Sequence, residues 1–261
     1  MDEIPHAKFI EGIWFPEHDG HMSGHVKNHS KVGTVTLGDG RRVGTYQKHK
    51  LNYAMDMLSA NRRRTAVDVG GHIGLWSMHL VDLFRRVEAF EPLPEHWRLF
   101  EVNMNHNPRV KLHPIGLGSK RGELTLVVDP LNTGNTHAVG SDIGTEEAVA
   151  FQERLRLGIV VGNGDESTKV HAEVVKVATL DSFNFNDVDL IKVDVEGTEL
   201  QVMQGARRTL LRCRPMVIVE QKNNDVKFHG GESNAASNYL QNLGMVLRKD
   251  YGGDHIMDWP E

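Results

Sequence analysis

The sequence has little of several features that would place it in a specialised class of protein. One cysteine, Cys213, is present among 261 residues, which excludes an intramolecular disulfide. No apolar run approaches the roughly 20 residues needed to cross a bilayer. The first residues lack the basic and apolar regions of a signal peptide. We therefore expect a cytoplasmic protein without a membrane partner.

An excess of positive charge is also missing. The chain carries 30 Lys and Arg against 35 Asp and Glu, which gives a formal net charge of −5 at pH 7. Proteins that bind nucleic acid through their overall charge usually have a basic surface. Nucleic acid therefore ranks low among the expected partners, and the composition does not predict an oligomeric state.

The sequence does contain a regular alternation of strand-like and helix-like segments from residue 65 onward. Strand patterns lie at 65–69, 87–90, 110–113, 190–193 and 215–219, helical patterns at 75–83, 95–104 and 200–211, and a closing hairpin at 245–247 and 255–257. This alternation is typical of parallel strands joined by right-handed crossover helices. It predicts an α/β, Rossmann-like domain over residues 61–261.

Two regions fall outside this alternation. We interpret residues 1–60 as an N-terminal extension and substrate lid, with a hairpin near 34–40 and an amphipathic helix within 45–60. Residues from about 120 to 177 form an insertion. Its expected elements are antiparallel strands at 123–128 and 170–177 and a helix at 146–157.

The most specific motif is the loop Asp68-Val69-Gly70-Gly71-His72-Ile73-Gly74, which follows a strand pattern and opens a helix. Glycine lets the backbone approach a ligand closely and adopt a positive φ. The dinucleotide fingerprint would place glycines at 70, 72 and 75, where this chain has Gly70, His72 and Leu75. The spacing argues against a nicotinamide oxidoreductase and favours a nucleoside without a pyrophosphate.

Two acids near this loop suit S-adenosylmethionine, which carries an amine and a sulfonium cation in place of phosphate. Asp68 precedes the loop and can hold these cations directly or through water. Glu91 ends the second strand about 20 residues further on, the spacing at which such folds bind a ribose diol. The structural alternatives are a tight turn without ligand and a solvated charge at a strand end, but both features in one βαβ unit favour the cofactor.

Several stretches of the sequence resemble the FkbM family of S-adenosylmethionine-dependent methyltransferases. They are residues 67–77, 90–92, 177–181 and 191–206, with 217–220 closing the resemblance. The most family-specific stretch is Asp194-Val195-Glu196-Gly197-Thr198-Glu199. The chain departs from the family pattern at Gly71-His72, where Ala-Asn is more usual, and in a longer stretch at 140–170.

The resemblance implies a class I methyltransferase fold with a mostly parallel seven-stranded central sheet. It also implies S-adenosyl-L-methionine as cofactor and O-methylation of sugar or natural-product hydroxyls. The residues assigned to the cofactor are Asp68, Gly70, Gly71, His72, Gly74, Glu91, Pro92, Ile115 and Gly116. The segment 132–137 resembles a short polar turn of the family that approaches cofactor or acceptor, and a plain polar turn is the alternative.

Three further acids are the candidates for catalysis. Asp194, Glu196 and Glu220 fall at or just past strand ends, the edge at which open α/β sheets bind ligands. A hydroxyl that attacks a methyl group needs its proton removed, and a carboxylate can take it. We assign Asp194 as the base and Glu196 and Glu220 as helper or substrate-orienting acids.

These acids also have structural interpretations. They can cap the helix that begins near Thr198, or pair with Lys192 or Lys222. Three carboxylates can also hold a divalent cation, but their spacing does not demand one and we predict no metal.

The start of the chain is rich in histidine. His18, His21, His25 and His29 recur at spacings of three and four. Gly20 and Gly24 argue against a helix that would gather them into a zinc site. A mobile lid that offers Trp14 and Phe15 to an acceptor is the preferred interpretation.

The expected function is methylation of a hydroxyl on a sugar or another small polyhydroxylated or glycan acceptor. One alternative is N- or O-methylation of a macromolecule, RNA or protein. The Asn/Asp-Pro-Pro-Tyr/Phe motif of nucleic-acid amino-methylating enzymes is missing after the fourth strand, where Asp194-Val195-Glu196-Gly197 stands. A second alternative is a nucleoside-binding module without catalytic activity.

Overall fold

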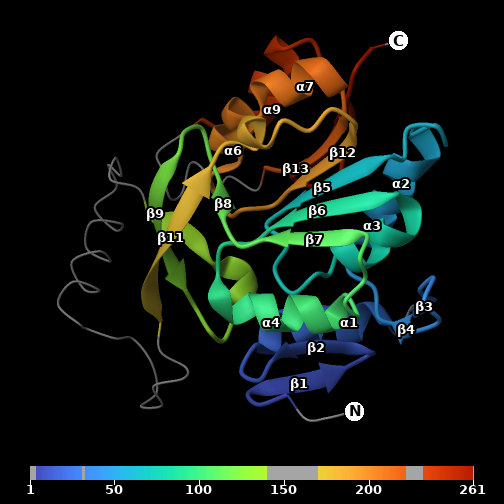
Figure 1. Cartoon of the computed structure of the whole chain (residues 1–261), viewed down its shortest axis with the longest axis vertical. Helices are drawn as coiled ribbons and strands as arrows, with labels where there is room; N and C mark the ends of the chain where they lie inside the picture. Colours follow the sequence, from blue (N-terminus) through green and yellow to red (C-terminus); the bar gives the residue numbers. More distant parts are fainter. Residues whose placement is uncertain (1–3, 31–32, 140–169, 222–231, 261) are drawn as a thin grey trace.

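The computed structural model describes residues 4–30, 33–139, 170–221 and 232–260. A main α/β sheet, a smaller sheet and an N-terminal segment make up these parts of the chain (Figure 1). The helix expected at 146–157 lies outside the described residues, as does Lys222. None of the helices in the described ranges has the length and hydropathy required to cross a bilayer.

The main sheet has, in the described part of the chain, seven strands in the order β14-β15-β13-β12-β5-β6-β7. Its strands are β5 (Thr65–Val69), β6 (Arg86–Phe90), β7 (Val110–His113), β12 (Val188–Val193), β13 (Met216–Glu220), β14 (Val246–Asp250) and β15 (Asp254–Asp258). Neighbours from β13 to β7 run parallel, whereas β15 is antiparallel to both β13 and β14. The predicted mostly parallel α/β sheet is therefore confirmed.

Helices cover both faces of this sheet. They are α2 (Lys48–Met57), α3 (Ser77–Leu83), α4 (Pro94–Asn103), α6 (Glu199–Gly205), α7 (Arg207–Cys213) and α9 (Ala235–Asn242). Leu80 of α3 packs in one apolar cluster with Ala66, while Met203 of α6 packs in another with the next strand residue, Val67. Successive residues of a strand face opposite sides, so a strand covered by helices on both sides is apolar at nearly every position.

The single helix predicted over residues 200–211 is divided in the structure into α6 and α7. Two distant segments of the chain contact this division. A Cβ on Gly205 would lie 1.9 Å from the carbonyl oxygen of Gly118, so only glycine allows that close approach. The Asp181 carboxylate then accepts the backbone N–H groups of Arg208 at 2.9 Å and Thr209 at 2.8 Å, which satisfies the first turn of α7.

The smaller sheet contains the antiparallel strands predicted for the insertion. β9 (Gly122–Val128) pairs with β11 (His171–Ala178) along its whole length. β10 (His137–Val139) adds to the outer edge of β9, and β8 (Gly116–Leu117) runs parallel to β11. This sheet lies to the left of the main sheet in Figure 1. The 3-10 helix η1 (Thr133–Asn135) connects β9 to β10.

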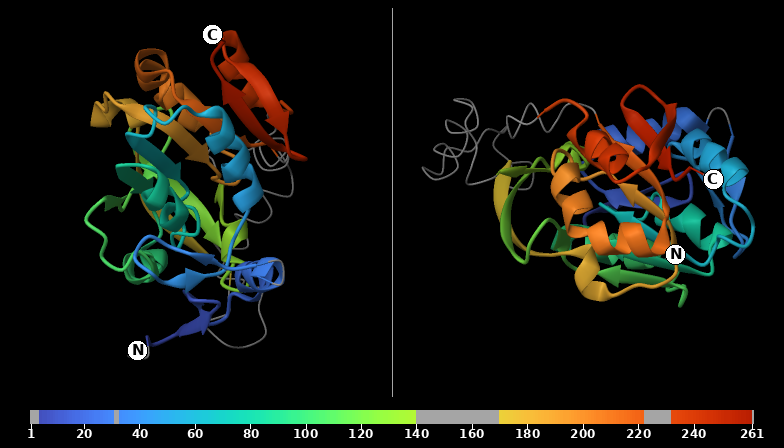
Figure 2. Two further views of the ribbon diagram at one scale, coloured as in Figure 1. Left: turned by 90° about the vertical axis from the view of Figure 1, so that its right-hand side faces the viewer. Right: turned by 90° about the horizontal axis from the view of Figure 1, so that it is seen from above.

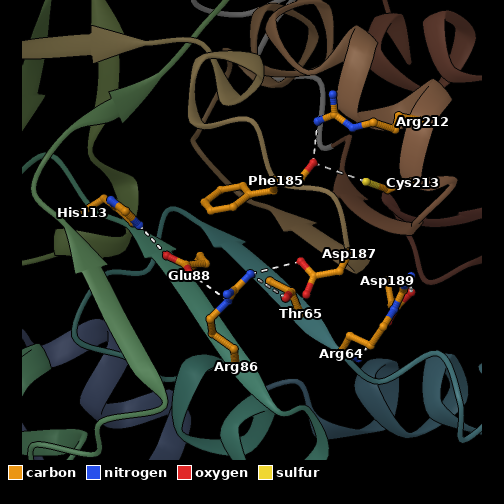
Figure 3. Close-up of polar contacts among 10 residues, drawn as sticks. All are labelled: Arg64, Thr65, Arg86, Glu88, His113, Phe185, Asp187, Asp189, Arg212 and Cys213. Atoms are coloured by element: carbon orange, nitrogen blue, oxygen red, sulfur yellow. Dashed lines mark hydrogen bonds and ion pairs between the residues drawn. The ribbon is translucent and has the colours of Figure 1, made fainter.

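Ion pairs hold neighbouring strands of the main sheet together (Figure 3). The Arg64 guanidinium donates to both carboxylate oxygens of Asp189, at 2.9 and 2.6 Å. Arg86 lies 3.0 Å from Glu88, and Nε2 of His113 lies 2.6 Å from the other oxygen of Glu88. The Arg64–Asp189 and His113–Glu88 contacts join neighbouring strands and so favour one strand register, whereas Arg86 and Glu88 both lie on β6.

The N-terminal segment forms two hairpins and a helix. The hairpins are β1 (Ala7–Ile10) with β2 (Ile13–Pro16), and β3 (Val35–Thr36) with β4 (Arg42–Val43); the helix is α1 (Gly20–Ser30). The first hairpin lies at the opposite end of the molecule from the hairpin of β14 and β15 (Figure 2). The hairpin near 34–40 and the helix within 45–60 are thereby confirmed.

The expectation that Gly20 and Gly24 prevent a helix is wrong. The Asp19 carboxylate accepts the N–H of Met22 at 2.8 Å, and Met22 and Val26, four residues apart, bury the inner face of α1. Packing of one apolar face outweighs the cost of about 1 kcal/mol for each helical glycine.

Phe15 belongs to the core and is fully buried, so its ring is not available to an acceptor. The same segment is tied to α4, because the amide of Asn103 bonds the N–H and the carbonyl of Trp14 at 2.8 and 2.9 Å. The role of residues 1–60 as a substrate lid remains a prediction.

Candidate active site

A cavity lies at the carboxyl ends of β5, β6 and β12, the edge at which the sequence predicted a ligand site. Of the assigned residues, those that line it are Gly70, Gly71, His72, Glu91, Pro92, Gly116, Asp194 and Glu196. Asp68, Gly74, Ile115 and Glu220 do not belong to its lining. The glycine loop and the acids after two neighbouring strands therefore meet around one space.

The glycine loop is held tightly against the end of β12. Gly70 has a φ of +78°, and a Cβ there would lie 1.9 Å from the carbonyl oxygen of Asp194. The N–H groups of Gly70 and Gly71 both donate to the carbonyl of Phe90 at 3.0 Å. The need for glycine at residue 70 thus comes from contact with the chain itself, and this contact brings Asp194 beside the loop.

Asp68 connects the strand before the glycine loop to the helix after it. Its side chain is fully buried, and it accepts a hydrogen bond from the Ser77 hydroxyl at 2.7 Å. Burial raises the pKa of Asp68, against the opposing effect of Lys192. This carboxylate connects α3 to the sheet and is not part of the cavity lining. Its contact with the cofactor, directly or through water, remains a prediction.

Glu91 occupies the position predicted for the ribose acid. Its carboxylate accepts the N–H groups of His72 at 2.8 Å and Leu93 at 2.9 Å, and Oε1 lies 3.2 Å from Nδ1 of His96. Burial by itself lowers the pKa of His96, but the Glu91, Glu95 and Asp19 carboxylates together outweigh it and raise that pKa. Since each carboxylate oxygen has two lone pairs, Glu91 keeps capacity for a hydroxyl donor.

Lys192 is central to the site, although the sequence indicated only a role as an ion-pair partner. It is buried in β12, directly beside Asp68 in the strand register. Its ammonium lies 3.4 Å from Asp194 and 3.8 Å from Asp68. Burial lowers the pKa of Lys192, but Asp194, Asp68 and Glu220 together outweigh this effect and raise it. The lysine therefore stays charged and fixes the acids on either side of the loop.

The three candidate catalytic acids do come together. One oxygen each of Asp194, Glu196 and Glu220 lies within 4.8 Å of the others. Their oxygens are also ligands suited to a divalent cation, and the absence of a metal remains a prediction.

Glu199, the first residue of α6, binds the loop that leads into this helix. Glu199 accepts the N–H groups of Gly197 at 3.0 Å and Val195 at 3.4 Å. Burial raises the pKa of Glu199 to about 7, against the opposing effect of these hydrogen bonds. Glu199 thus holds the loop that precedes α6.

Residues from the N-terminal segment and the insertion complete the lining. Met22, Tyr46 and Thr133 contribute side chains. Burial raises the pKa of Tyr46, and the Asp194 and Glu220 carboxylates add to the effect, so the phenol keeps its proton and remains a donor. Thr133 lies in the polar turn at 132–137, which the sequence had connected with the site; the position of Tyr46 had no comparable sequence signal.

A seven-stranded sheet of this order, with a glycine loop after its central strand and acids at the ends of the next strands, has the architecture of a class I, Rossmann-like methyltransferase. The model of the Methyltransferase FkbM domain matches residues 68–247. The chain therefore belongs to the FkbM methyltransferase family. This membership confirms the predicted class of enzyme and its cofactor, S-adenosylmethionine.

Similar proteins cover this chain to different extents. Methyltransferase 1 of Beauveria bassiana is 30% identical over 148 residues, which are 53% of this chain and 57% of that protein. Methyltransferase sdnD of Sordaria araneosa is 28% identical over 67% of this chain and 73% of that protein. The crystal structure of a methyltransferase FkbM from Methylobacillus flagellatus is 17% identical, with a TM-score of 0.44, over 76% of this chain and 44% of that chain.

Proposed function

We propose that this protein transfers the methyl group of S-adenosylmethionine to a hydroxyl of a sugar or another small polyhydroxylated molecule. The observation that carries the proposal is the meeting of the glycine loop, Glu91 and Asp194 around one cavity. S-adenosylmethionine supplies an activated methyl group when it is bound. The work left to the chain is to hold the cofactor, place the acceptor and remove its proton.

The residues of the cavity fit the cofactor chemically. Glu91 offers a free carboxylate lone pair to a ribose hydroxyl, and the loop at Gly70 and Gly71 exposes backbone beside it. Asp194 and Glu196 bring negative charge to the same cavity, which suits a ligand that carries an amine and a sulfonium cation.

The acceptor hydroxyl requires a base and a fixed orientation. Asp194 lines the cavity and is held by the Lys192 ammonium at 3.4 Å, so its carboxylate is fixed in one position. It takes the hydroxyl proton as the oxygen attacks, a role that contributes typically 10²–10⁴-fold to a rate. Tyr46 and Glu196 offer polar groups to further hydroxyls of the acceptor, and such positioning adds to the rate by proximity.

Transfer of a tritiated methyl group to a panel of sugars, RNA and peptides tests the proposal. We expect incorporation into a hydroxylated small molecule. Asp194→Asn should reduce the rate about 10²–10⁴-fold with the cofactor product still bound, whereas Asp56→Asn, an exposed carboxylate of α2 outside this cavity, should not. Incorporation into RNA or peptide alone, or full turnover by Asp194→Asn, would contradict the assignment of acceptor or base.

A further inference from the structure

Three polar side chains from distant parts of the sequence form a chain of hydrogen bonds that ends at the cavity. Asp19 precedes α1, Thr133 begins η1, and His72 lies in the glycine loop. Oγ1 of Thr133 donates to the Asp19 carboxylate and lies 2.7 Å from Nε2 of His72. Asp19 and Thr133 are both buried, so water does not compete for these contacts.

With Asp19 ionised, the available protons allow one arrangement of these hydrogen bonds. An ionised carboxylate only accepts hydrogen bonds, and a threonine hydroxyl has one proton to donate. The Asp19 carboxylate accepts the hydrogen bond from the Thr133 hydroxyl, and it also accepts the N–H of Met22 at 2.8 Å. The Thr133 oxygen is then left as an acceptor for His72, which requires a hydrogen on Nε2 of the imidazole. In a neutral imidazole the other nitrogen, Nδ1, then carries a lone pair.

His72 is neutral in this environment. Burial lowers the pKa of His72 well below its usual value, and the nearby His96 and Lys192 lower it further. The His72 and His96 rings are 4.2 Å apart between centroids. Nδ1 of His72 is itself buried and has no hydrogen-bond partner in the described part of the chain. His72 lines the cavity, so a ligand that opens the packing around Nδ1 can supply the missing donor.

We propose that Asp19 and Thr133 are positioning residues that fix His72 as the Nε2–H tautomer, so that its Nδ1 accepts a hydrogen bond from a hydroxyl or amine of the bound cofactor. The inference rests on the proposed function, because that function supplies the ligand. It gives the N-terminal segment and the turn at η1 a defined part in cofactor binding. It also explains a carboxylate buried at the start of α1.

Two measurements test the proposal, and the first needs no ligand. Nitrogen-15 NMR of histidine-labelled protein, with the His72 signal assigned by its loss in His72→Gln, should show the neutral Nε2–H tautomer at pH 7. Thr133→Val, which removes the hydroxyl and keeps the shape, should broaden or shift this signal. Thr133→Ser should restore it, and Thr125→Val, on β9 outside the cavity, should leave it unchanged.

The second measurement is calorimetric titration with S-adenosylhomocysteine and with adenosine. Thr133→Val should weaken S-adenosylhomocysteine binding about fivefold, the worth of one net hydrogen bond, and Thr133→Ser should not. An equal loss for adenosine places the donor on the nucleoside, and a loss for S-adenosylhomocysteine alone places it on the amino-acid part. An Nδ1–H tautomer, an imidazolium, or unchanged affinity in Thr133→Val would overturn the proposal.

The failure of the two proposals can be told apart. Suppose that the wild-type protein shows the Nε2–H tautomer but binds neither compound. This result would overturn the proposed cofactor contact and the proposed function, and it would support the hydrogen-bond chain from Asp19 to His72. If the wild-type protein binds both compounds but shows the other tautomer, only the hydrogen-bond chain from Asp19 to His72 would be overturned.

Discussion

The carbonyl oxygen of Asp194 occupies the space that a side chain on residue 70 would need, because a Cβ on Gly70 would lie 1.9 Å from it. One contact thus joins the glycine loop after β5 to the acid after β12. The two most characteristic motifs of the sequence are therefore parts of one rigid unit, and a change in either is expected to affect both.

Gly70→Ala should lower both stability and cofactor affinity. The substitution adds a clash with Asp194 and places alanine at a φ of +78°. Together these effects should lower the free energy of unfolding by at least about 1–3 kcal/mol. Thermal unfolding and titration with S-adenosylhomocysteine measure the two effects. Gly122→Ala is the matched control, since nothing lies within 4 Å of a Cβ there. Equal behaviour of the two variants would contradict the packing of the loop.

Lys192→Met should destabilise the protein strongly. The substitution leaves the buried Asp68 and the neighbouring Asp194 without their shared cation, which lies 3.8 and 3.4 Å from them. Removing one partner of a buried ion pair costs about 3–5 kcal/mol. Urea unfolding measures this loss, and Lys120→Met, at an exposed position, serves as the comparison. Adding Asp68→Asn to Lys192→Met should recover part of the loss, and a further loss would argue against the pairing.

Glu199 gives the stability a defined pH dependence. Its pKa in the folded protein is raised from 4.5 to about 7, so between these values the folded state holds a proton that the unfolded state has released. The free energy of unfolding therefore falls as the pH rises from about 4.5 to 7, by an amount on the order of 3 kcal/mol from this group. Denaturant unfolding across this range should show the decline.

Glu199→Gln should flatten that profile, because the amide cannot ionise and its oxygen still accepts the N–H groups of Gly197 and Val195. Glu101→Gln, an exposed residue of α4, should keep the wild-type slope. Identical profiles for wild type and Glu199→Gln would show that another group is responsible.

Gly24→Ala tests whether α1 is a helix. The position lies inside α1, and nothing lies within 4 Å of a Cβ there. Alanine should therefore stabilise the protein by about 0.5–1 kcal/mol, measured by thermal unfolding. Gly12→Ala, where a Cβ would lie 2.2 Å from the carbonyl oxygen of Arg42, should instead destabilise it. Destabilisation by Gly24→Ala would contradict the helix.

The sequence predicted the main sheet well because its signals are local. Each interior strand is a short run that contains several apolar residues between loops, and the glycine loop and Glu91 stand at the ends of consecutive strands. The division of the helix at residue 206 was not visible, because the Asp181 carboxylate that satisfies the first turn of α7 comes from a distant segment. The helix α1 was missed for a similar reason, since burial of Met22 and Val26 outweighs the local effect of glycine.

The site was predictable where it follows strand ends and was not where it depends on tertiary contacts. Asp194 and Glu196 line the cavity as their position after β12 suggested, whereas Asp68 lies beneath it. Lys192 reads as a charge within an apolar strand, and its role appears only when Asp68 is found beside it in the register. Tyr46 reaches the cavity from a segment to which the sequence gave no catalytic part.

Calorimetric titration of the wild-type protein with S-adenosylhomocysteine, with NAD in a parallel experiment, tests the central claim most directly. We predict saturable binding of S-adenosylhomocysteine at one site per chain, none of NAD, and a clear loss of affinity in Glu91→Gln. Failure of the wild-type protein to bind S-adenosylhomocysteine or S-adenosylmethionine, or preference for NAD, would contradict the claim that this cavity holds the methyl donor.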